Sequence, residues 1–443
     1  MSDPVSINYI VAPGGALKGR FRLPGDKSIS HRALMLSAIA EGQTRINGFL
    51  EGEDTLATLS AFRAMGVEIT HRNQQDVVVN GVGLHGLTAP SGPLDLGNSG
   101  TSVRLLAGLL SGQSFNSELI GDASLMRRPM RRVTQPLQMM NADITCTQQG
   151  TLPIKIRGGR KLHGIDYALP IVSAQLKSCL LLAGLYAEGK TCIHEPAQTR
   201  DHTERMLEQF GYVLNMRNNP ICITGGGKLR ATEITVPGDI SSAAFFIVGA
   251  CISEGSEITL EQVGINPTRD AVIHILKSMG ADITVNNPRI QSGEPVGDIR
   301  VRSSQLHGIE IPLDLVPAAI DEFPAIMIAA ASANNRTVLK GAAELRVKES
   351  DRIMAMTEGL KAIGINAKAN EDGMEVEGGR IRGGVVDSFN DHRVAMAFAM
   401  AGLVAKDLIT IKDCANVNTS FPGFVDLADQ AGLGIRQGDA GAR

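Results

Sequence analysis

One structural unit is repeated along the chain, and this repetition limits the folds that it can adopt. Residues 23–69 and 236–283 follow the same order: a Pro-Gly break, an apolar helix, a Glu-Gly turn, a short strand, a second helix and a β-branched strand. Further copies of the apolar helix begin near Gly97, Leu169, Asp321 and Asn390. The period of roughly 70–85 residues is longer than that of common solenoid repeats. Each copy is therefore interpreted as an α/β module.

The two helices of each module differ in polarity. First helices such as AAFFIVGACI are apolar on every side, so we expect them to be buried at the centre of the fold. Second helices such as TRDHTERMLEQFG have a polar side and should cover the outside. Each second helix is expected to end at a Gly or Asn, as helices commonly do. These residues are Gly66, Asn141, Gly211, Gly280, Gly364 and Gly432.

The modules fall into two groups, which predicts two similar lobes with a mixed α/β fold. Three copies precede Pro237-Gly238 and three follow it. Lobe one would comprise residues 1–24 and 238–443, and lobe two residues 25–237. The N-terminal strand, at about residues 5–22, would then pair within lobe one. An open solenoid scaffold is the alternative, but the termini lack the polar capping repeats that a solenoid needs.

The composition argues against several classes of function. Of the 443 residues, 43% are hydrophobic and 20% are charged, and the net charge is −3. The chain is therefore too apolar to be disordered, and it lacks the basic field that attracts nucleic acid. It contains no Trp, which removes a common stacking platform for single-stranded bases.

Membrane, secretion and metal signals are also missing from the sequence. No run of about 18 apolar residues is present, and the first residues do not resemble a signal peptide. The cysteines, at positions 146, 179, 192, 222, 251 and 414, form no Cys-x-x-Cys pair. We therefore expect a cytoplasmic protein with free thiols, no bound metal and no membrane partner.

One formal nucleotide-binding match is rejected. Residues 184–191, GLYAEGKT, satisfy the phosphate-loop pattern G-x-x-x-x-G-K-T. A phosphate loop follows a strand and opens a helix, whereas here an apolar helix comes first and a strand follows. The segment is predicted to be a helix-to-strand turn.

Charged and small polar residues gather where the apolar helices begin. The free N–H groups and the partial positive charge of a helix start bind anions, and adjacent Lys or Arg side chains strengthen such a site. The residues concerned include Lys27, Ser28, Arg32, Gly100, Arg128, Ser173, Gln175, Arg200, Asp321, Lys348, Glu349, Arg352 and Arg393. The pattern favours a ligand with phosphate and carboxylate groups, although Gln175 could equally be a helix cap.

These segments closely resemble the EPSP synthase family of enolpyruvyl transferases. The matching strings are LPGDKSISHRAL, LGNSGTSVRLLAG, RRPM, SAQ, DEFPAIMIAAA, LRVKESDRI, DHRVAMAFA and TSFPGF, spread over residues 23–424. The resemblance implies two lobes, each of three βαβαββ units arranged as an inside-out α/β barrel, with the active site in the interdomain cleft.

The resemblance also implies the reaction. Members of the family transfer the enolpyruvyl group of phosphoenolpyruvate to the 5-hydroxyl of shikimate 3-phosphate and release phosphate, in the pathway to chorismate and the aromatic amino acids. The chemistry needs one acid, one base and cationic groups for a dianion, without a cofactor or metal. The family further suggests a monomer and sensitivity to glyphosate, a phosphonate that mimics bound phosphoenolpyruvate.

Site roles are carried over by motif. The residues matching shikimate 3-phosphate contacts are Lys27, Ser28, Arg32, Ser173, Ala174, Gln175, Arg200, Asp321 and Lys348. The residues matching phosphoenolpyruvate contacts are Lys27, Gly100, Arg128, Gln175, Arg352 and Arg393. The catalytic candidates are Asp321 as the base for the 5-hydroxyl, Glu349 as the second proton carrier, and Lys27, which would touch both substrates.

Two departures and one rival family qualify the resemblance. Thr419 stands where many relatives have Lys, which puts one phosphate contact in doubt, and Ala174 replaces a Ser near the 3-phosphate. Both features are similar to glyphosate-tolerant bacterial members. The rival, the UDP-N-acetylglucosamine enolpyruvyl transferase family, carries a reactive Cys in a loop where this chain has DASLMRR. A repeat scaffold or DNA clamp would instead place its basic patches away from helix starts.

Overall fold

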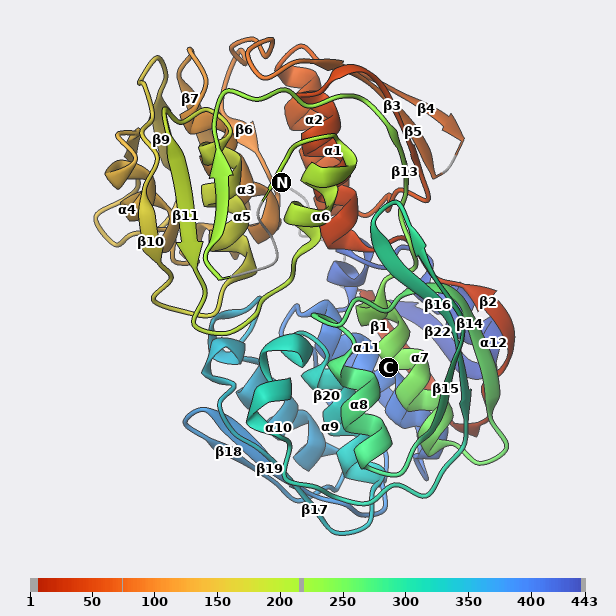
Figure 1. The fold of residues 1–443 in the computed structure, drawn as a ribbon. Helices are drawn as coiled ribbons and strands as arrows, with labels where there is room; N and C mark the ends of the chain where they lie inside the picture. Colours follow the sequence, from red (N-terminus) through yellow and green to blue (C-terminus); the bar gives the residue numbers. More distant parts are fainter. Residues whose placement is uncertain (1–6, 74, 215–218, 440–443) are drawn as a thin grey trace. The chain divides into compact units, whose positions relative to one another are not determined.

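The computed structural model describes residues 7–73, 75–214 and 219–439. The chain divides into two compact units, which can be followed by colour in Figure 1. Unit 1 comprises Met1–Pro24, Pro237–Arg289 and Pro295–Arg443, and unit 2 comprises Gly25–Val236 and Ile290–Glu294. Each unit contains its own apolar core.

Unit 2 is built around apolar helices at the positions that the repeat predicts. These helices are α1 (Lys27–Ala38), α3 (Gly100–Ser111) and α5 (Ala174–Gly184). In α3 every residue except Thr101 is buried, as expected for a helix that is apolar on all sides. The more polar helices α2 (Glu53–Ala64), α4 (Arg131–Met139) and α6 (His202–Gln209) bury only part of their residues. The predicted difference between first and second helices is confirmed here.

The sheets of unit 2 share one pairing pattern. Their strand orders are β13 (Glu233–Thr235), β3 (Glu41–Asn47), β5 (Asp76–Val82), β4 (Glu68–Asn73); β6 (Leu94–Asp95), β7 (Ser117–Ile120), β9 (Ile154–Arg157), β8 (Asp143–Thr145); and β10 (Asp166–Ala168), β11 (Lys190–His194), β12 (Ile221–Thr224). The first two strands of each sheet are parallel, and the remaining neighbours are antiparallel. The repeat in the sequence is therefore also a repeat in topology.

Unit 1 has the same arrangement of helices. Its buried helices are α7 (Ile240–Ile252), α9 (Phe323–Ser332) and α11 (His392–Ala401), and its second helices are α8 (Ala271–Ser278), α10 (Arg352–Ala362) and α12 (Phe424–Ala431). In α7 every residue except Ile252 is buried. Unit 1 also contains the short 3-10 helices η2 (Leu313–Leu315), η3 (Pro317–Ala319), η4 (Ala343–Val347), η5 (Gly402–Val404) and η6 (Ala415–Thr419). The 3-10 helix η1 (Leu125–Arg127) belongs to unit 2.

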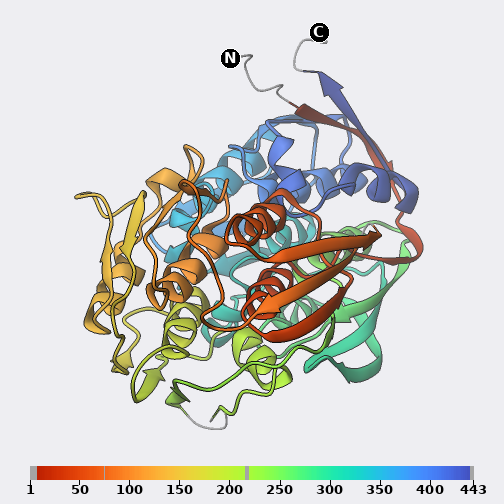
Figure 2. The same ribbon diagram turned by 90° about the horizontal axis from the view of Figure 1, so that it is seen from above.

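The N-terminal segment pairs within unit 1, as the sequence predicts. The strand orders are β15 (Asp282–Gln291), β16 (Glu294–Arg302), β14 (Glu257–Gly264), β2 (Lys18–Arg22); β17 (Arg336–Leu339), β19 (Gly373–Glu377), β18 (Ala367–Asn370); and β20 (Gly384–Asp387), β21 (Ile409–Lys412), β1 (Ile7–Gly15), β22 (Leu433–Asp439). Strand β2 is parallel to β14, and β1 is antiparallel to both β21 and β22. Figure 2 shows β1 in red beside β22 in blue.

The predicted helix ends are confirmed by the backbone. The residues that follow the second helices all have positive φ, which Gly adopts without strain and Asn tolerates. The values are 86° for Gly66, 74° for Asn141, 79° for Gly211, 98° for Gly280, 85° for Gly364 and 113° for Gly432. The rejection of a phosphate loop at residues 184–191 is likewise confirmed, because α5 ends at Gly184 and β11 begins at Lys190.

The expectation of free thiols is wrong for one pair of cysteines. Cys192 of β11 and Cys222 of β12 form a disulfide, with Cα atoms 4.2 Å apart. The antiparallel register places the two residues directly opposite each other. The sequence does not reveal this pairing, because the cysteines are 30 residues apart and only the register brings them together. The free cysteines of the described residues are Cys146, Cys179, Cys251 and Cys414.

Candidate functional site

The start of α1 presents the first predicted site residues, Lys27 and Ser28. The side chain of Asp26 caps the helix, and its Oδ1 accepts a hydrogen bond from the backbone N–H of Ile29 at 2.8 Å. Lys27 forms an ion pair with Asp54 of α2. Both Lys27 and Ser28 are partly exposed, so the start of this helix is accessible to a ligand.

Arg32 lies one turn further along α1 and is held by neighbouring helices. Its Nε donates to Thr203 Oγ1 at 2.6 Å, its Nη2 donates to Ser178 Oγ at 2.8 Å, and its Nη1 donates to the backbone oxygen of Ser28 at 2.9 Å. Burial lowers the pKa of the Arg32 guanidinium to about 10, so the group remains charged at neutral pH. A ligand carboxylate would have to share this guanidinium with the hydroxyls of α5 and α6.

Two further guanidinium groups meet at the start of α3. A Cβ placed on Gly100 would lie 3.0 Å from Nη1 of Arg128 and 3.2 Å from Nη1 of Arg104. Arg104 Nη1 donates to Gln175 Oε1, and Gln175 Nε2 donates to Thr101 Oγ1 at 3.1 Å. The structure thus brings together Gly100, Arg128 and Gln175, which lie far apart in the sequence.

The start of α5 carries the remaining predicted residues of unit 2. Ser173 is the N-cap of α5, and its Oγ accepts from the backbone N–H of Leu176 at 3.3 Å. Ala174 and Gln175 are the first helical residues. Arg200 immediately precedes Asp201, the N-cap of α6, and its charge, together with the stronger effect of burial, lowers the pKa of Arg32. Arg200 is therefore close enough to α1 to act electrostatically on it.

The predicted residues of unit 1 also form a cluster, at the starts of α9, α10 and α11. Asp321 Oδ1 lies 3.3 Å from Lys348 Nζ and 3.3 Å from Arg352 Nη1. Arg352 Nη2 contacts Glu349 Oε2 at 2.6 Å, and Arg393 Nη1 donates to the backbone oxygen of Asp321 at 2.8 Å. A candidate base and a candidate acid therefore share one guanidinium.

Asp391 also contacts the guanidinium of Arg352 and orients it. Its Oδ2 lies 2.8 Å from Arg352 Nε and accepts a hydrogen bond from Ser350 Oγ at 3.0 Å. Burial alone lowers the pKa of Arg352, but Asp391, Glu349 and Asp321 together raise it above its ordinary value. Burial alone raises the pKa of Asp391, and Arg352 reverses the shift to a lowered value. Both groups of the buried pair are therefore charged at neutral pH.

The chain matches a known protein family over most of its length. The family model described as EPSP synthase (3-phosphoshikimate 1-carboxyvinyltransferase) matches residues 11–427. The chain belongs to the EPSP synthase family. A protein of Alkalilimnicola ehrlichii named 3-phosphoshikimate 1-carboxyvinyltransferase is 63% identical over 438 residues, which are 99% of this chain and 98% of the relative. A protein of the same name from Nitrosococcus oceani is 63% identical over 430 residues, covering 97% of each chain.

A solved structure agrees with this membership. The structure of EPSP synthase from Acinetobacter baumannii is 56% identical, has a TM-score of 0.88, and covers 98% of this chain and 100% of its own. The predicted α/β fold of repeated modules is thus that of solved EPSP synthases.

The structure adds two side chains to the predicted site, the guanidinium of Arg104 and the carboxylate of Asp391. Arg104 contacts Gln175, and Asp391 contacts Arg352, yet neither was assigned a site role. A signal existed for Arg104, since it follows Gly100 by one helical turn, as Arg32 follows Ser28.

Thr419 is the residue that stands where many relatives have Lys. Its hydroxyl donates to the backbone oxygen of Asn416 at 2.7 Å within its own 3-10 helix.

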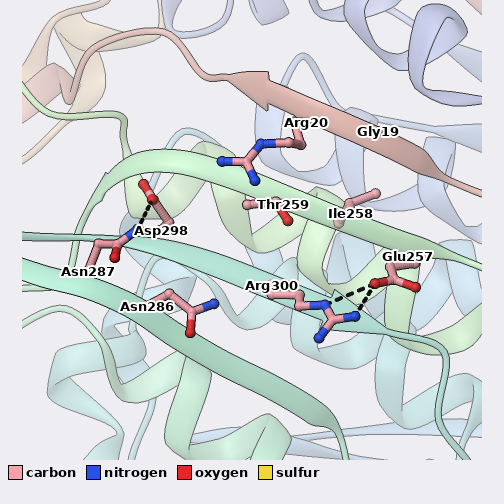
Figure 3. Close-up of a pocket in the computed structure, with 9 residues that line it drawn as sticks. All are labelled: Gly19, Arg20, Glu257, Ile258, Thr259, Asn286, Asn287, Asp298 and Arg300. Carbon is pink, nitrogen blue, oxygen red and sulfur yellow. Dashed lines mark hydrogen bonds and ion pairs between the residues drawn. The ribbon is translucent and has the colours of Figure 1, made fainter.

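A pocket elsewhere in unit 1 does not contain predicted site residues. It measures about 420 Å³ and lies against the strands β2, β14, β15 and β16 (Figure 3). Arg300 in its lining is ion-paired with Glu257, and Arg20 is ion-paired with Glu261 at 2.8 Å. Both arginine side chains that line the pocket are therefore already ion-paired to carboxylates of the same unit.

Within residues 7–73, 75–214 and 219–439, no group of three or more His, Cys, Asp or Glu side chains is placed to hold a metal ion. Among the helices of that same part of the chain, none has the length and apolarity to cross a membrane.

A buried histidine beside the site should make stability depend on pH. Burial, followed by the charges of Lys27 and Arg32, lowers the pKa of His31 well below its ordinary value, and Asp26 opposes this only weakly. The unfolded chain therefore binds an extra proton below about pH 6.5, and stability is lost as the pH falls through that value. Between pH 7.5 and 5.5 this histidine alone should cost about 1.4 kcal/mol of unfolding free energy.

Urea unfolding at the two pH values tests this expectation. His31→Gln should lose about 1.4 kcal/mol less than the wild type between pH 7.5 and 5.5. His163→Gln, which changes an exposed histidine of the same unit, should behave as the wild type does. An equal pH response in the His31 variant would show that His31 is protonated in the folded protein.

Proposed function

We infer that this chain catalyses the EPSP synthase reaction, the transfer of the carboxyvinyl group of phosphoenolpyruvate to shikimate 3-phosphate with release of phosphate. The observation that carries the inference is the family match over residues 11–427. The product, 5-O-(1-carboxyvinyl)-3-phosphoshikimate, leads to chorismate and the aromatic amino acids in the shikimate pathway. The clusters at the helix starts would supply the cations and carboxylates that this chemistry requires.

Shikimate 3-phosphate presents one phosphate and one carboxylate, and the helix starts of unit 2 suit both groups. The N–H groups at the start of α5 and the guanidinium of Arg200 would hold the 3-phosphate. Ser28 and Arg32 would hold the ring hydroxyls and the carboxylate. The proposed contacts are Lys27, Ser28, Arg32, Ser173, Ala174, Gln175, Arg200, Asp321 and Lys348.

Phosphoenolpyruvate would be held chiefly by arginine side chains. The proposed contacts are Lys27, Gly100, Arg128, Gln175, Arg352 and Arg393. Gly100 leaves the start of α3 bare, so a phosphate oxygen can approach the backbone N–H groups closely. At Arg352, the ligand must compete with Asp321 and Glu349, which already contact Nη1 and Nη2.

The proton transfers assign separate roles to the two carboxyl groups. Asp321 would accept the proton of the 5-hydroxyl as its oxygen attacks C2 of phosphoenolpyruvate, while Glu349 would deliver a proton to the methylene carbon. The tetrahedral intermediate then loses phosphate, and removal of a methyl proton restores the double bond. Arg352, which contacts both carboxylates, would keep them oriented while neutralising the charge on the ligand.

An assay with defined substrates tests the inference. The purified chain should convert shikimate 3-phosphate and phosphoenolpyruvate into equal amounts of phosphate and of the enolpyruvyl product seen by mass spectrometry. Shikimate 3-phosphate alone should raise the melting temperature. Turnover of UDP-N-acetylglucosamine in place of shikimate 3-phosphate would contradict the inference.

The setting of the enzyme is also proposed. We expect a monomer, acting in the cytoplasm on small-molecule substrates, without a nucleic-acid or membrane partner. Light scattering during size exclusion should give a mass near 46.9 kDa, and a dimer mass at micromolar concentration would contradict the monomer.

Glyphosate should distinguish the role of Gly100. An added methyl group would stand 3.0 Å from Nη1 of Arg128, the end of a flexible side chain that can shift. Because glyphosate is longer than phosphoenolpyruvate, Gly100→Ala should raise its inhibition constant at least about tenfold more than the KM for phosphoenolpyruvate, a difference of about 1.4 kcal/mol. Steady-state inhibition measurements give both constants.

Gly92→Ala is the matched control, because no atom lies within 4 Å of the added methyl group. This variant should leave both constants unchanged. If Gly100→Ala raises both constants by the same factor, Gly100 does not discriminate between the two ligands.

A further inference from the structure

A buried charge cluster in unit 2 lies directly beneath the proposed 3-phosphate site. Lys177 of α5 is one turn from the N-cap Ser173, and its side chain is only 1% exposed. Its Nζ lies 2.6 Å from Glu204 Oε1 and 3.2 Å from Glu195 Oε1. Removing one member of a buried ion pair is strongly destabilising because it leaves its partner uncompensated, so the positions of both carboxyl groups depend on Lys177.

The cluster holds the chain segment that leads to Arg200. Glu195 Oε1 accepts hydrogen bonds from the backbone N–H and the hydroxyl of Thr199, and Lys177 Nζ donates to the Thr199 backbone oxygen at 3.5 Å. Residues 195–199 are thereby closed into a loop at both ends. Thr199 is the residue immediately before Arg200.

A second anchor fixes the beginning of the same loop. The backbone N–H of Glu195 donates to Asn219 Oδ1 at 3.0 Å, and Asn219 Nδ2 donates to the Glu195 backbone oxygen at 2.9 Å. The Glu195 backbone is thus fixed by Asn219 and its side chain by Lys177. Lys177 therefore connects the intervening loop to α5.

The helix that follows Arg200 is tied to α5 as well. Glu204 lies on α6 and contacts Lys177, while Thr203 Oγ1 donates to Ser178 Oγ at 2.7 Å. Burial raises the pKa of Glu204, and Lys177 counteracts this shift. Lys177 therefore joins both the segment before Arg200 and the helix after it to the helix that carries Ser173 and Ala174.

We propose that Lys177 is a positioning residue for shikimate 3-phosphate, which fixes Arg200 relative to the start of α5 through Glu195, Thr199 and Glu204. The proposal rests on the assignment of Arg200 to the 3-phosphate. Without the ammonium group, the carboxyl groups of Glu195 and Glu204 would lose their shared partner, and the loop would lose its contacts with α5. The loop would move outward, and ordering Arg200 around the phosphate would then cost conformational entropy at the moment of binding.

A double-mutant cycle with Arg200 tests the proposal. Lys177→Met should raise the calorimetric Kd for shikimate 3-phosphate at least about tenfold, and Arg200→Ala should have an effect of similar size. If Lys177 acts through Arg200, adding Lys177→Met to Arg200→Ala should change the Kd less than about twofold. The KM for phosphoenolpyruvate, measured at saturating shikimate 3-phosphate, should change less than about threefold.

Companion variants keep the test valid if Lys177→Met folds poorly. Glu195→Ala removes the loop contact but leaves the ion pair of Lys177 with Glu204, and it should raise the Kd only when Arg200 is present. Lys177→Arg should recover part of the affinity. Lys190→Met, an exposed lysine on β11, is the matched control and should leave the Kd unchanged.

The outcomes separate this proposal from the assignment on which it rests. An unchanged Kd in Arg200→Ala would reject the assignment of Arg200 to the phosphate and the proposal with it. If each variant raises the Kd strongly and the double variant raises it by the product of the two factors, Lys177 acts independently of Arg200. If both Lys177→Met and Glu195→Ala lower the melting temperature but leave the Kd unchanged, the cluster stabilises the fold and does not position Arg200.

Discussion

Replacing Asp321 by Asn should lower kcat at least about a hundredfold, the usual scale for loss of a general base, which corresponds to about 2.7 kcal/mol of transition-state stabilisation. Asp321 immediately precedes Glu322, the N-cap of α9, and its Oδ1 lies 3.3 Å from both Lys348 Nζ and Arg352 Nη1. Asn has nearly the same shape, so the local packing should persist. What it lacks is the capacity to accept the proton of the 5-hydroxyl.

Binding separates this role from a contact role. The Kd for shikimate 3-phosphate should rise less than about tenfold in Asp321→Asn, because Lys348 and the contacts in unit 2 remain. Asp314→Asn, an exposed carboxylate on η2, is the control and should keep wild-type kcat. Near-normal turnover in Asp321→Asn would remove this residue from the proton transfer, and a large loss of binding with unchanged kcat would make it a substrate contact.

The helices of the fold were predictable because their signals are local. The apolar composition of α7 predicts burial, and Gly280 after α8 predicts the helix end that its φ of 98° confirms. The pairing of the strands was harder to predict from the sequence. Strand β13 pairs with β3, which lies far from it in the sequence, and neither strand contains a residue that specifies the other. The disulfide of Cys192 was missed for the same reason, since only the register of β11 and β12 places Cys222 opposite it.

The candidate site likewise has features that could be predicted from the sequence and features that could not. The run from Lys348 to Arg352 is contiguous, so its cluster of charges could be predicted from the sequence. The contact of Arg352 with Asp391 depends on how two helices pack, and no spacing in the sequence encodes it. Lys177 is an intermediate case. A lone lysine in the apolar run LKSCLLLAG indicates a buried ion pair, but the sequence does not identify Glu195 and Glu204 as its partners.

Arg352→Lys should weaken phosphoenolpyruvate more than shikimate 3-phosphate, although Lys348 and Arg352 lie on one short segment. The guanidinium meets Asp391 through Nε at 2.8 Å, Glu349 through Nη2 at 2.6 Å and Asp321 through Nη1 at 3.3 Å. A lysine ammonium is a compact point charge on a flexible stem and cannot reproduce this planar fork. Loss of one charged hydrogen bond, worth about 1.5–3 kcal/mol, should raise the KM for phosphoenolpyruvate roughly ten- to a hundredfold.

Calorimetry and steady-state kinetics together decide whether this selectivity exists. The Kd for shikimate 3-phosphate should rise less than about threefold in Arg352→Lys, since its proposed contacts in unit 1 are Asp321 and Lys348 and not Arg352. Arg336→Lys is the matched control, because Arg336 is an exposed arginine of the same unit that contacts Glu375 at 2.9 Å, and it should change neither constant. The melting temperature of Arg352→Lys should fall, because a buried ammonium leaves some of the carboxylate oxygens around it poorly paired. Equal weakening of both substrates would mean that Arg352 maintains the whole cluster and does not bind phosphoenolpyruvate selectively.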